Sequence, residues 1–169
     1  MAQFQPCFAR THGEGMLRKL GLAAMREGDA ELGNTILADM QRHEVDFTLF
    51  FRRLADAQEP GEGDEPVRAL FRDPAAADAV LGLWRARLAL EPRPVLERRS
   101  AMNAVNPAYI PRNHRIEAVI RAAIDEGDLG PFEELRAVLS RPFDPQPKFA
   151  RYQQAPLAHE RVRATFCGT

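Results

Sequence analysis

Three hydrogen-bonding side chains stand together in the middle of the sequence and are its first candidates for chemistry. Arg112, Asn113 and His114 end the segment NPAYIPRNH, which begins at Asn106. A guanidinium and an amide can bind carbonyl or carboxylate oxygens. The segment is therefore a candidate chemical site, and the alternative is a turn between two helices.

Two prolines in the same segment favour the turn. Because Pro107 disfavours a helical conformation at the residue before it, one helix should end at Asn106. Pro111 suits the first turn of the next helix, where its missing N–H costs nothing. Tyr109 and Ile110 would then form an apolar plug between two helices. We predict a rigid joint that could dock this region on another part of a protein, built by Asn106, Pro107, Tyr109, Pro111, Arg112 and Asn113.

The cysteines are the next candidates. Cys7 and Cys167 lie almost a full chain apart, a spacing that fits neither a disulfide framework nor a zinc site. Cys167 stands near the end of the sequence, in FCGT, where a thiol on a terminal segment can reach partners that a core thiol cannot. It is our candidate for redox chemistry, and the alternative is an unreactive thiol packed under the tail.

The sequence lacks the commonest patterns for binding phosphate or metal. It contains neither G-x-G-x-x-G nor G-x-x-x-x-G-K-[ST]. Glu133 and Glu134 are adjacent, but neighbouring helix residues point about 100° apart, so we expect a solvated first turn rather than an acid–base pair. No histidine has a second His or Cys at ligand spacing, and the four are His12, His43, His114 and His159. We assign no catalytic, cofactor-binding or metal-binding residue to this chain.

Arginines are concentrated between Arg93 and Arg121, where six of them stand against Glu97 and Glu117. This stretch is either a contact surface for phosphate or an acidic partner, or a solvated helix face. The whole chain has a formal net charge of −1 and a pI of about 6.4, which gives no general attraction to nucleic acid or an anionic membrane. No apolar run approaches the ~20 residues that a bilayer requires, and the N-terminus has no signal-peptide pattern. We therefore expect a cytoplasmic location and no membrane segment.

The spacing of apolar residues is helical almost everywhere, which predicts an all-α fold. Phe47, Phe50, Phe51 and Leu54, for example, recur on one helix face behind Asp46, a suitable N-cap. We expect a single helical region over residues 1–169, an irregular array of six or seven short helices. An acidic loop rich in Gly and Pro should lie at about 56–66, and an extended C-terminal tail should cover 141–169.

Two short segments resemble one another. AAMREGDAEL at 23–32 and AAIDEGDLGP at 122–131 each place Gly-Asp between two helices. We interpret them as the same turn used twice, with Gly after one helix and Asp as the N-cap of the next. The alternative, a true duplication, finds no support in the flanking residues.

Four pieces, in this order, resemble the C-terminal part of the selenoprotein O family. They are RKLGL, DFTLFFRRL, MNAVNPAYIPRNHRIEAVIRAAIDEGD and the terminal FCGT. The resemblance implies part of a protein-kinase-like fold that transfers AMP from ATP to protein hydroxyl groups, assisted by Mg²⁺ or Mn²⁺. It also implies two partners for the complete protein, the kinase-like catalytic core and the protein substrates.

The resemblance leaves the catalytic residues of the family outside this chain. The family's ATP- and metal-binding residues lie upstream of the matching part, so we expect no ATP, Mg²⁺ or Mn²⁺ to be bound by this chain alone. Cys167 occupies the place of a family cysteine that can pair near the catalytic loop, which implies redox control. The segment PCFARTHGEG departs from the family's continuous helix, because Gly13 and Gly15 each cost about 1 kcal/mol in a helix interior. We expect a frayed, altered or artificially cut start.

Two functions follow as hypotheses. The first is the C-terminal helical region of such an adenylyltransferase, inactive alone. The second is a stand-alone helical interaction module that uses the stretch from Arg93 to Arg121. Under the first hypothesis, a helical region removed from its core should expose an apolar face and self-associate through it.

Overall fold

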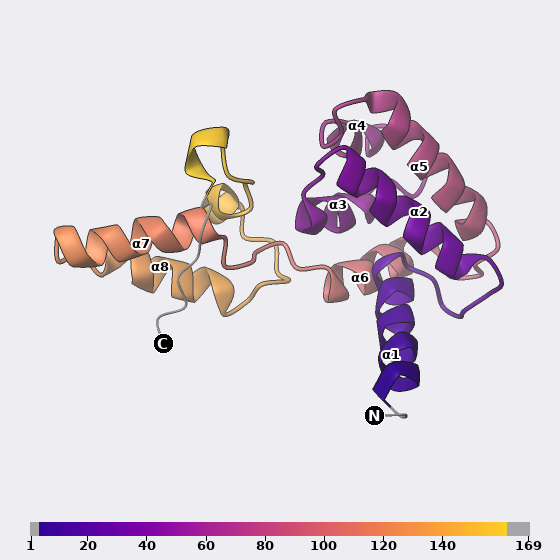
Figure 1. Cartoon of the computed structure of the whole chain (residues 1–169), viewed down its shortest axis with the longest axis horizontal. Coiled ribbons are helices and arrows are strands. Elements are labelled where there is room, and N and C mark those ends of the chain that lie inside the picture. The colour runs from indigo at the N-terminus through magenta and orange to yellow at the C-terminus, as the bar shows by residue number, and fades with distance from the viewer. Residues whose placement is uncertain (1–3, 162–169) are drawn as a thin grey trace. The chain divides into compact units, whose positions relative to one another are not determined.

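The computed structural model describes residues 4–161, and their side chains from residue 7 onward. This range contains eight α-helices, two 3-10 helices and no strand, which confirms the all-α prediction (Figure 1). The helices are α1 (Phe4–Lys19), α2 (Asp29–Arg42), α3 (Phe47–Leu54), α4 (Asp64–Arg68), α5 (Pro74–Leu88), α6 (Val95–Val105), α7 (Asn113–Asp125), α8 (Gly130–Leu139), η1 (Pro147–Tyr152) and η2 (Ala158–Glu160). No helix in the described part of the chain is both long and apolar enough to cross a membrane.

The chain divides between Asn106 and Pro107 into two compact units, where we expected a single helical region. Each unit has an apolar cluster of its own, which is the physical basis of the division. The first cluster runs from Leu17 to Met102, and the second from Ala108 to Tyr152. The two units are therefore described separately.

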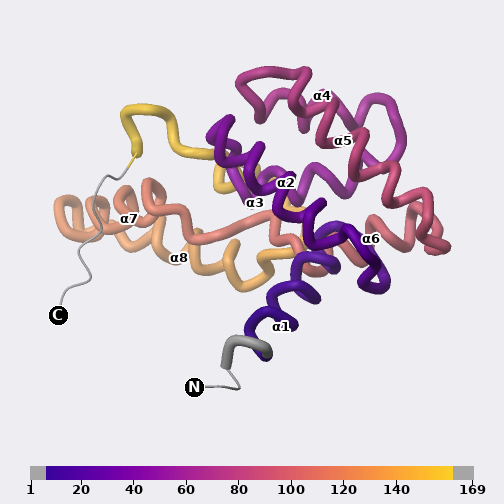
Figure 2. The backbone as a smooth tube through the Cα atoms, turned by 45° about the vertical axis from the view of Figure 1, so that its right-hand side comes forward, coloured from indigo at the N-terminus to yellow at the C-terminus, as the bar shows by residue number. Residues whose placement is uncertain are grey.

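Trp84 on α5 lies at the centre of the first unit. Its side chain is fully buried, and its indole N–H donates a hydrogen bond of 2.9 Å to the carbonyl of Leu20. Phe50, Phe51 and Leu54 of α3 are buried as their spacing predicts. The backbone trace shows α2 and α5 lying alongside one another (Figure 2).

Helix ends set by local chemistry lie where the sequence predicts them. Asp46 accepts a hydrogen bond from the backbone N–H of Leu49, and Asp73 accepts one from that of Ala75. Gly21 has a φ of 75°, the left-handed conformation that ends a helix. A Cβ at Gly21 would also stand 2.8 Å from the sulfur of Met102, so this glycine allows α1 and α6 to approach closely.

Three local expectations need correction. Helix α1 runs without a break through Gly13 and Gly15, because buried Leu17 and Leu20 anchor its second half in the core. The acidic loop is shorter than expected, since α4 begins at Asp64. The number of α-helices in residues 4–161 is eight rather than six or seven, and α4 is one of the shortest.

The two Gly-Asp turns also differ. Gly28 and Gly127 both have positive φ, 88° and 67°. Asp29, however, is the first residue of α2 rather than its N-cap, and its carboxylate is buried against Arg87. Asp128 is exposed and accepts a hydrogen bond from the N–H of Gly130. The shared sequence therefore gives a shared glycine conformation and two different roles for the aspartate.

A buried ion network holds α2 to α5 in the first unit. The guanidinium of Arg87 contacts Asp29 at 2.6 Å and Glu91 at 2.6 Å. A second pair joins Asp64 of α4 to Arg85 of α5. Although burial opposes ionisation, hydrogen bonds from Arg87 hold the pKa of Asp29 and of Glu91 below the usual values. The hydrogen bond from Arg85 lowers the pKa of Asp64 in the same way.

These lowered pKa values predict loss of stability in acid. A carboxylate whose pKa is depressed by folding stabilises the folded state above its unfolded pKa and loses that contribution as the pH falls. The free energy of unfolding of the first unit should therefore fall steeply below about pH 4. Urea titrations from pH 7 to pH 3, followed by Trp84 fluorescence, measure it.

Two variants test this prediction, one at a carboxylate in a buried ion pair and one, as the control, at an exposed carboxylate. Asp64→Asn should flatten the acid dependence, because it removes a carboxylate that is held ionised by Arg85. Glu31→Gln changes an exposed residue of α2 and should leave the curve unchanged. Equal acid dependence in all three proteins would contradict the assignment.

The second unit is a helical hairpin with a folded tail. Helices α7 and α8 pack side by side (Figures 1 and 2), and Leu135 and Val138 of α8 are buried in the second cluster. Ile120 and Ile124 of α7 are 44% and 76% exposed, so part of the predicted apolar face of α7 is uncovered. The expected extended tail contains η1 and η2 within its described part.

Candidate functional site

Asn106, the first residue of the predicted joint, is a buried clip inside the first unit. Its side-chain amide donates to the carbonyl of Lys19 at 3.0 Å and accepts from the Lys19 ammonium at 3.2 Å. Arg52 of α3 donates to the carbonyls of Asn103 and Asn106, which satisfies the end of α6. The sequence alone predicts the helix end, and the structure adds the tie between α6 and the end of α1.

Lys19 is held in place by aromatic rings as well. Its Nζ lies 5.4 Å from the ring centres of both Phe47 and Phe51, a cation–π arrangement. Burial lowers the pKa of Lys19. The amide oxygen of Asn106 therefore accepts a hydrogen bond from an ammonium group that burial has partly removed from water.

Replacing Asn106 by alanine should lower the free energy of unfolding by about 1–3 kcal/mol, because it leaves the Lys19 carbonyl and ammonium without this partner. Asn103→Ala, in the last turn of α6, is a matched control, since the buried Asn103 Oδ1 has no hydrogen-bond partner within the described residues. Chemical denaturation of both variants measures the difference. Equal losses would show that the clip contributes nothing specific.

Tyr109 is the centre of the second unit. It is 1% exposed, and its hydroxyl donates to the carbonyl of Gln146 at 2.7 Å. The same oxygen accepts from the backbone N–H of Gln146 and from the side chain of Gln153. The backbone N–H groups of Ala108 and Tyr109 both donate to the carbonyl of Pro142. The segment after Pro107 is thus tied to the tail through Tyr109, more than the apolar plug that we expected.

Arg112, Asn113 and His114 line a cavity of about 290 Å³ at the start of α7, here named the α7 cavity. Arg112 is the N-cap residue, so Pro111 lies just outside the helix rather than in its first turn. The other lining residues are Ile110, Pro111, Pro156, Glu160 and Arg161. The three adjacent polar residues of the motif therefore line one cavity.

His114 is 8% exposed, and its Nε2 has no hydrogen-bond partner among residues 4–161. Burial lowers the pKa of His114, and the charges of Arg115 and Arg112 lower it further against the opposing effect of Glu160. The motif alone does not predict this environment, because the residues around His114 come from the tail as well as from the start of α7.

The arginine-rich stretch is not one uniform surface, because its arginines differ in burial. Arg98 is 6% exposed and donates to Gln58 and to the carbonyl of Arg93. Arg99 forms an ion pair with Asp56 at 2.5 Å. The boundary between the units also divides the stretch, leaving Arg112 and the arginines that follow in the second unit.

The adjacent carboxylates have separate partners. Glu133 pairs with Arg136 within α8. Glu134 accepts hydrogen bonds from the hydroxyl of Tyr152 and from Arg151. The hydrogen bond from Tyr152 lowers the pKa of Glu134. The pKa of Tyr152 is raised, mainly by burial and then by its hydrogen bond to the Glu134 carboxylate. Glu134 thus ties α8 to η1 rather than only facing solvent.

The structure describes only one of the two cysteines. Cys7 is exposed on α1, and Cys167 lies outside the described residues. Within residues 4–161, no three His, Cys, Asp or Glu side chains are placed to hold a metal ion together.

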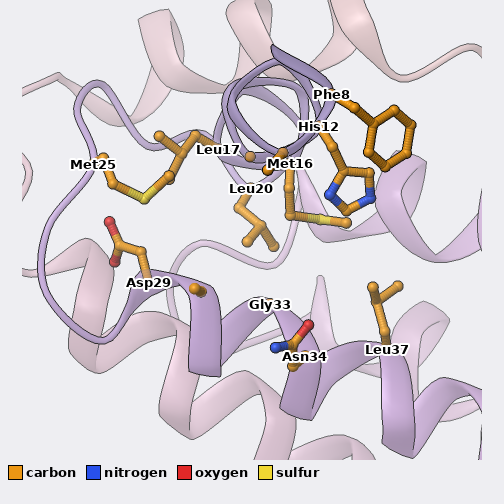
Figure 3. Close-up of a pocket in the computed structure, with 13 residues that line it drawn as sticks. Phe8, His12, Met16, Leu17, Leu20, Met25, Asp29, Gly33, Asn34 and Leu37 are labelled. Carbon is orange, nitrogen blue, oxygen red and sulfur yellow. The ribbon is translucent and has the colours of Figure 1, made fainter. Parts of the chain in front are cut away.

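A second cavity, which the sequence does not predict, lies between α1 and α2 (Figure 3). This α1–α2 groove has a volume of about 350 Å³ and is mainly apolar. Phe8, His12 and Met16 on α1 face Asn34 and Leu37 on α2 across it. Phe8 and Met25 on its rim are 60% and 53% exposed. The sequence does not reveal this groove, because α1 on its own has no distinct apolar face.

The described residues thus form an all-helical region. Asn106 and Tyr109 of the NPAYIPRNH motif are buried in it and hold neighbouring segments together. The family model described as "Protein adenylyltransferase SelO" matches residues 1–140. The chain therefore belongs to the SelO family.

Curated relatives are similar along almost the whole chain. It is 54% identical over 166 residues to a "Protein nucleotidyltransferase YdiU" of Bradyrhizobium sp. (strain BTAi1 / ATCC BAA-1182), covering 98% of this chain and 34% of that protein. It is 51% identical over 169 residues to the protein of the same name from Rhodopseudomonas palustris (strain BisB18), covering 100% of this chain and 34% of that protein. The chain thus spans about a third of the length of the curated relatives it matches.

Proposed function

We propose that this chain is the C-terminal helical region of a SelO-family protein adenylyltransferase and does not transfer AMP by itself. The observation that supports this most is the similarity of nearly the whole chain to about 34% of proteins named as nucleotidyltransferases. The burial of Asn106 and Tyr109 gives further support, since these motif residues serve helix joints rather than an open reaction centre.

In the proposed complete protein, this region supports a kinase-like catalytic core that supplies the ATP and Mg²⁺ or Mn²⁺ sites. The α1–α2 groove is the proposed contact on the first unit, because an apolar groove with an exposed apolar rim is typical of a surface that another protein segment covers. The joint from Asn106 to Asn113 contributes by fixing the ends of the helices next to it. The proposed location is the cytoplasm.

The proposal is tested by nucleotide binding to the purified chain. Isothermal titration calorimetry with ATP and excess Mg²⁺ should show no metal-dependent binding at micromolar concentration. Micromolar, Mg²⁺-dependent binding would overturn the proposal, because it would require a triphosphate and metal site within this chain.

A second candidate function is a stand-alone interaction module that self-associates. The observation in its favour is the exposed apolar surface of the second unit, where Ile124, Leu129 and Phe132 are 76%, 60% and 46% exposed. Sedimentation of the purified chain tests whether this surface drives self-association. Concentration-dependent association that Ile124→Lys abolishes would show that it does, and a monomer at all concentrations would count against the surface as an interaction site.

Redox control through Cys167 is a further part of the proposal and rests on the family resemblance alone. It is tested in a chimera in which this chain replaces the matching third of the Bradyrhizobium relative. AMP transfer by the chimera should depend on reductant, Cys167→Ser should remove that dependence, and Cys7→Ser should not. Unchanged redox dependence in the Cys167→Ser variant would end this role.

A further inference from the structure

The described part of the chain ends at the α7 cavity. Its last two residues, Glu160 and Arg161, line the cavity together with Pro156. Eight residues, VRATFCGT at 162–169, follow Arg161 in the sequence and are here called the terminal segment. At about 3.3–3.6 Å per extended residue, this segment is long enough to fold back over the cavity. It is therefore the nearest candidate to occupy it.

The apolar part of the lining suits an apolar side chain. It consists of Ile110, Pro111 and Pro156. A cavity of about 290 Å³ has room for one large side chain rather than for a helix. Phe166 is the only aromatic residue of the terminal segment, and removing its ring from water is favourable. The two arginines of the lining have interactions of their own, so docking of this ring does not depend on their charge.

His114 supplies a polar anchor in the same cavity. The side chain is more than nine-tenths buried at 8% exposure, and its Nε2 meets no hydrogen-bond partner within the described range. Because an unpaired buried polar atom is costly, such atoms generally find a partner. Every residue of the terminal segment carries a backbone N–H and a carbonyl. A neutral imidazole nitrogen can pair with one or the other, depending on its tautomer.

We propose that the terminal segment docks in the α7 cavity of its own chain, with the ring of Phe166 against the apolar lining and a backbone group bonded to His114 Nε2. Since only a few residues join the segment to the cavity, its effective concentration there is on the order of millimolar. An intrinsic dissociation constant of about 0.1 mM would then leave the segment docked roughly nine-tenths of the time. Cys167 follows Phe166, so docking holds its thiol beside the start of α7.

Docking of the terminal segment deepens the proposed redox role of Cys167, and this consequence rests on the proposed function. A thiol held against its own chain must be released before it can reach a partner elsewhere in the complete protein. The docking equilibrium therefore sets the fraction of chains in which Cys167 is available. Docking itself does not require that the complete protein transfer AMP, and its test measures no activity.

The test places a nitroxide spin label on Cys167 of the full, ¹⁵N-labelled chain, with Cys7→Ser so that the label has one site. In NMR spectra, the amide signals of Asn113 and His114 at the start of α7 should be strongly broadened. The signal of Asp125, at the other end of the same helix, should be broadened much less. Equal broadening along the whole of α7 would overturn the proposal.

Two variants of the terminal segment separate docking from mere tethering at Arg161. Phe166→Ser should reduce the broadening at His114 to about half or less, because burying a phenylalanine favours the docked state about tenfold or more. Ala164→Ser changes a small residue of the same segment and should leave the broadening unchanged. Undiminished broadening in Phe166→Ser would show a tethered segment that does not dock, and would overturn the proposal.

A mixed sample shows whether the segment docks on its own chain. It combines ¹⁵N-labelled chain without spin label and spin-labelled chain without ¹⁵N. Docking within one chain predicts no broadening at Asn113 and His114 in this mixture. Broadening as strong as in the singly prepared sample would show docking on a second copy and would contradict the proposal.

Discussion

Replacing Arg87 by methionine should lower the free energy of unfolding of the first unit by about 3–5 kcal/mol. The variant leaves the carboxylates of Asp29 and Glu91 in place, with side-chain exposures of 1% and 2%. Two buried negative charges would then lack their shared cation, and the carbonyl of Ala24 would lose a donor. Urea denaturation followed by the fluorescence of Trp84, the single tryptophan of the chain, measures this loss.

Two variants show whether the loss comes from unpaired charge. Arg72→Met removes an arginine that is 61% exposed in its side chain and pairs with Glu44, so it should cost less than about 1 kcal/mol. Adding Asp29→Asn and Glu91→Gln to Arg87→Met should recover part of the stability. A loss below about 1 kcal/mol in the single variant would show that the network does not hold α2 to α5.

Replacing Tyr109 by alanine should lower the free energy of unfolding of the second unit by about 3–5 kcal/mol, through lost burial and a cavity. Tyr109→Phe keeps the ring but removes the hydroxyl, which has three partners on Gln146 and Gln153. It should cost about 1–3 kcal/mol, since buried polar groups lose their partner. Hydrogen exchange of the α7 and α8 amides measures both losses in this unit.

Tyr152→Phe is the matched control for the hydroxyl. Its partner Glu134 keeps the ion pair with Arg151 and is 33% exposed, so water can replace the lost bond. The loss should therefore be smaller than in Tyr109→Phe. If Tyr109→Phe leaves exchange unchanged while Tyr152→Phe accelerates it, Tyr109 is not the centre of this unit.

Features that depend on a few neighbouring residues could be predicted from the sequence. Asp46 and Asp73 cap helices because the donors they accept from lie two or three residues away. The positive φ of Gly21 could be expected, because glycine lacks a Cβ and adopts this conformation with little strain. The all-α fold follows in the same way, since each apolar stripe is a local property of its helix.

Features that depend on distant partners could not be predicted. Asp29 looks like a helix cap in sequence, but Arg87, which is 58 residues away, binds its carboxylate. Arg98 looks like one charge of a basic stretch, yet Gln58 receives it in a buried site. His114 shows no sign in sequence of its unpaired Nε2, which depends on how the tail covers α7.

The candidate cavity could not be predicted from the motif. Arg112 and Asn113 lie with His114 around one cavity, whereas their sequence favoured a helix joint. Asn106 belongs to a separate clip in the first unit, because its amide reaches back to Lys19 across 87 residues. The exposure of Ile120 and Ile124 could not be predicted, since an apolar stripe in the sequence does not reveal whether another element covers it.

The most direct test of the proposed role is AMP transfer from labelled ATP to protein, measured for three samples under identical conditions. They are this chain alone, the remaining two thirds of the Bradyrhizobium relative alone, and the chimera that joins the two. We expect no transfer by this chain and transfer by the chimera that exceeds that of the remaining part. Transfer by this chain alone would contradict the account, and so would a folded chimera no more active than the part without it.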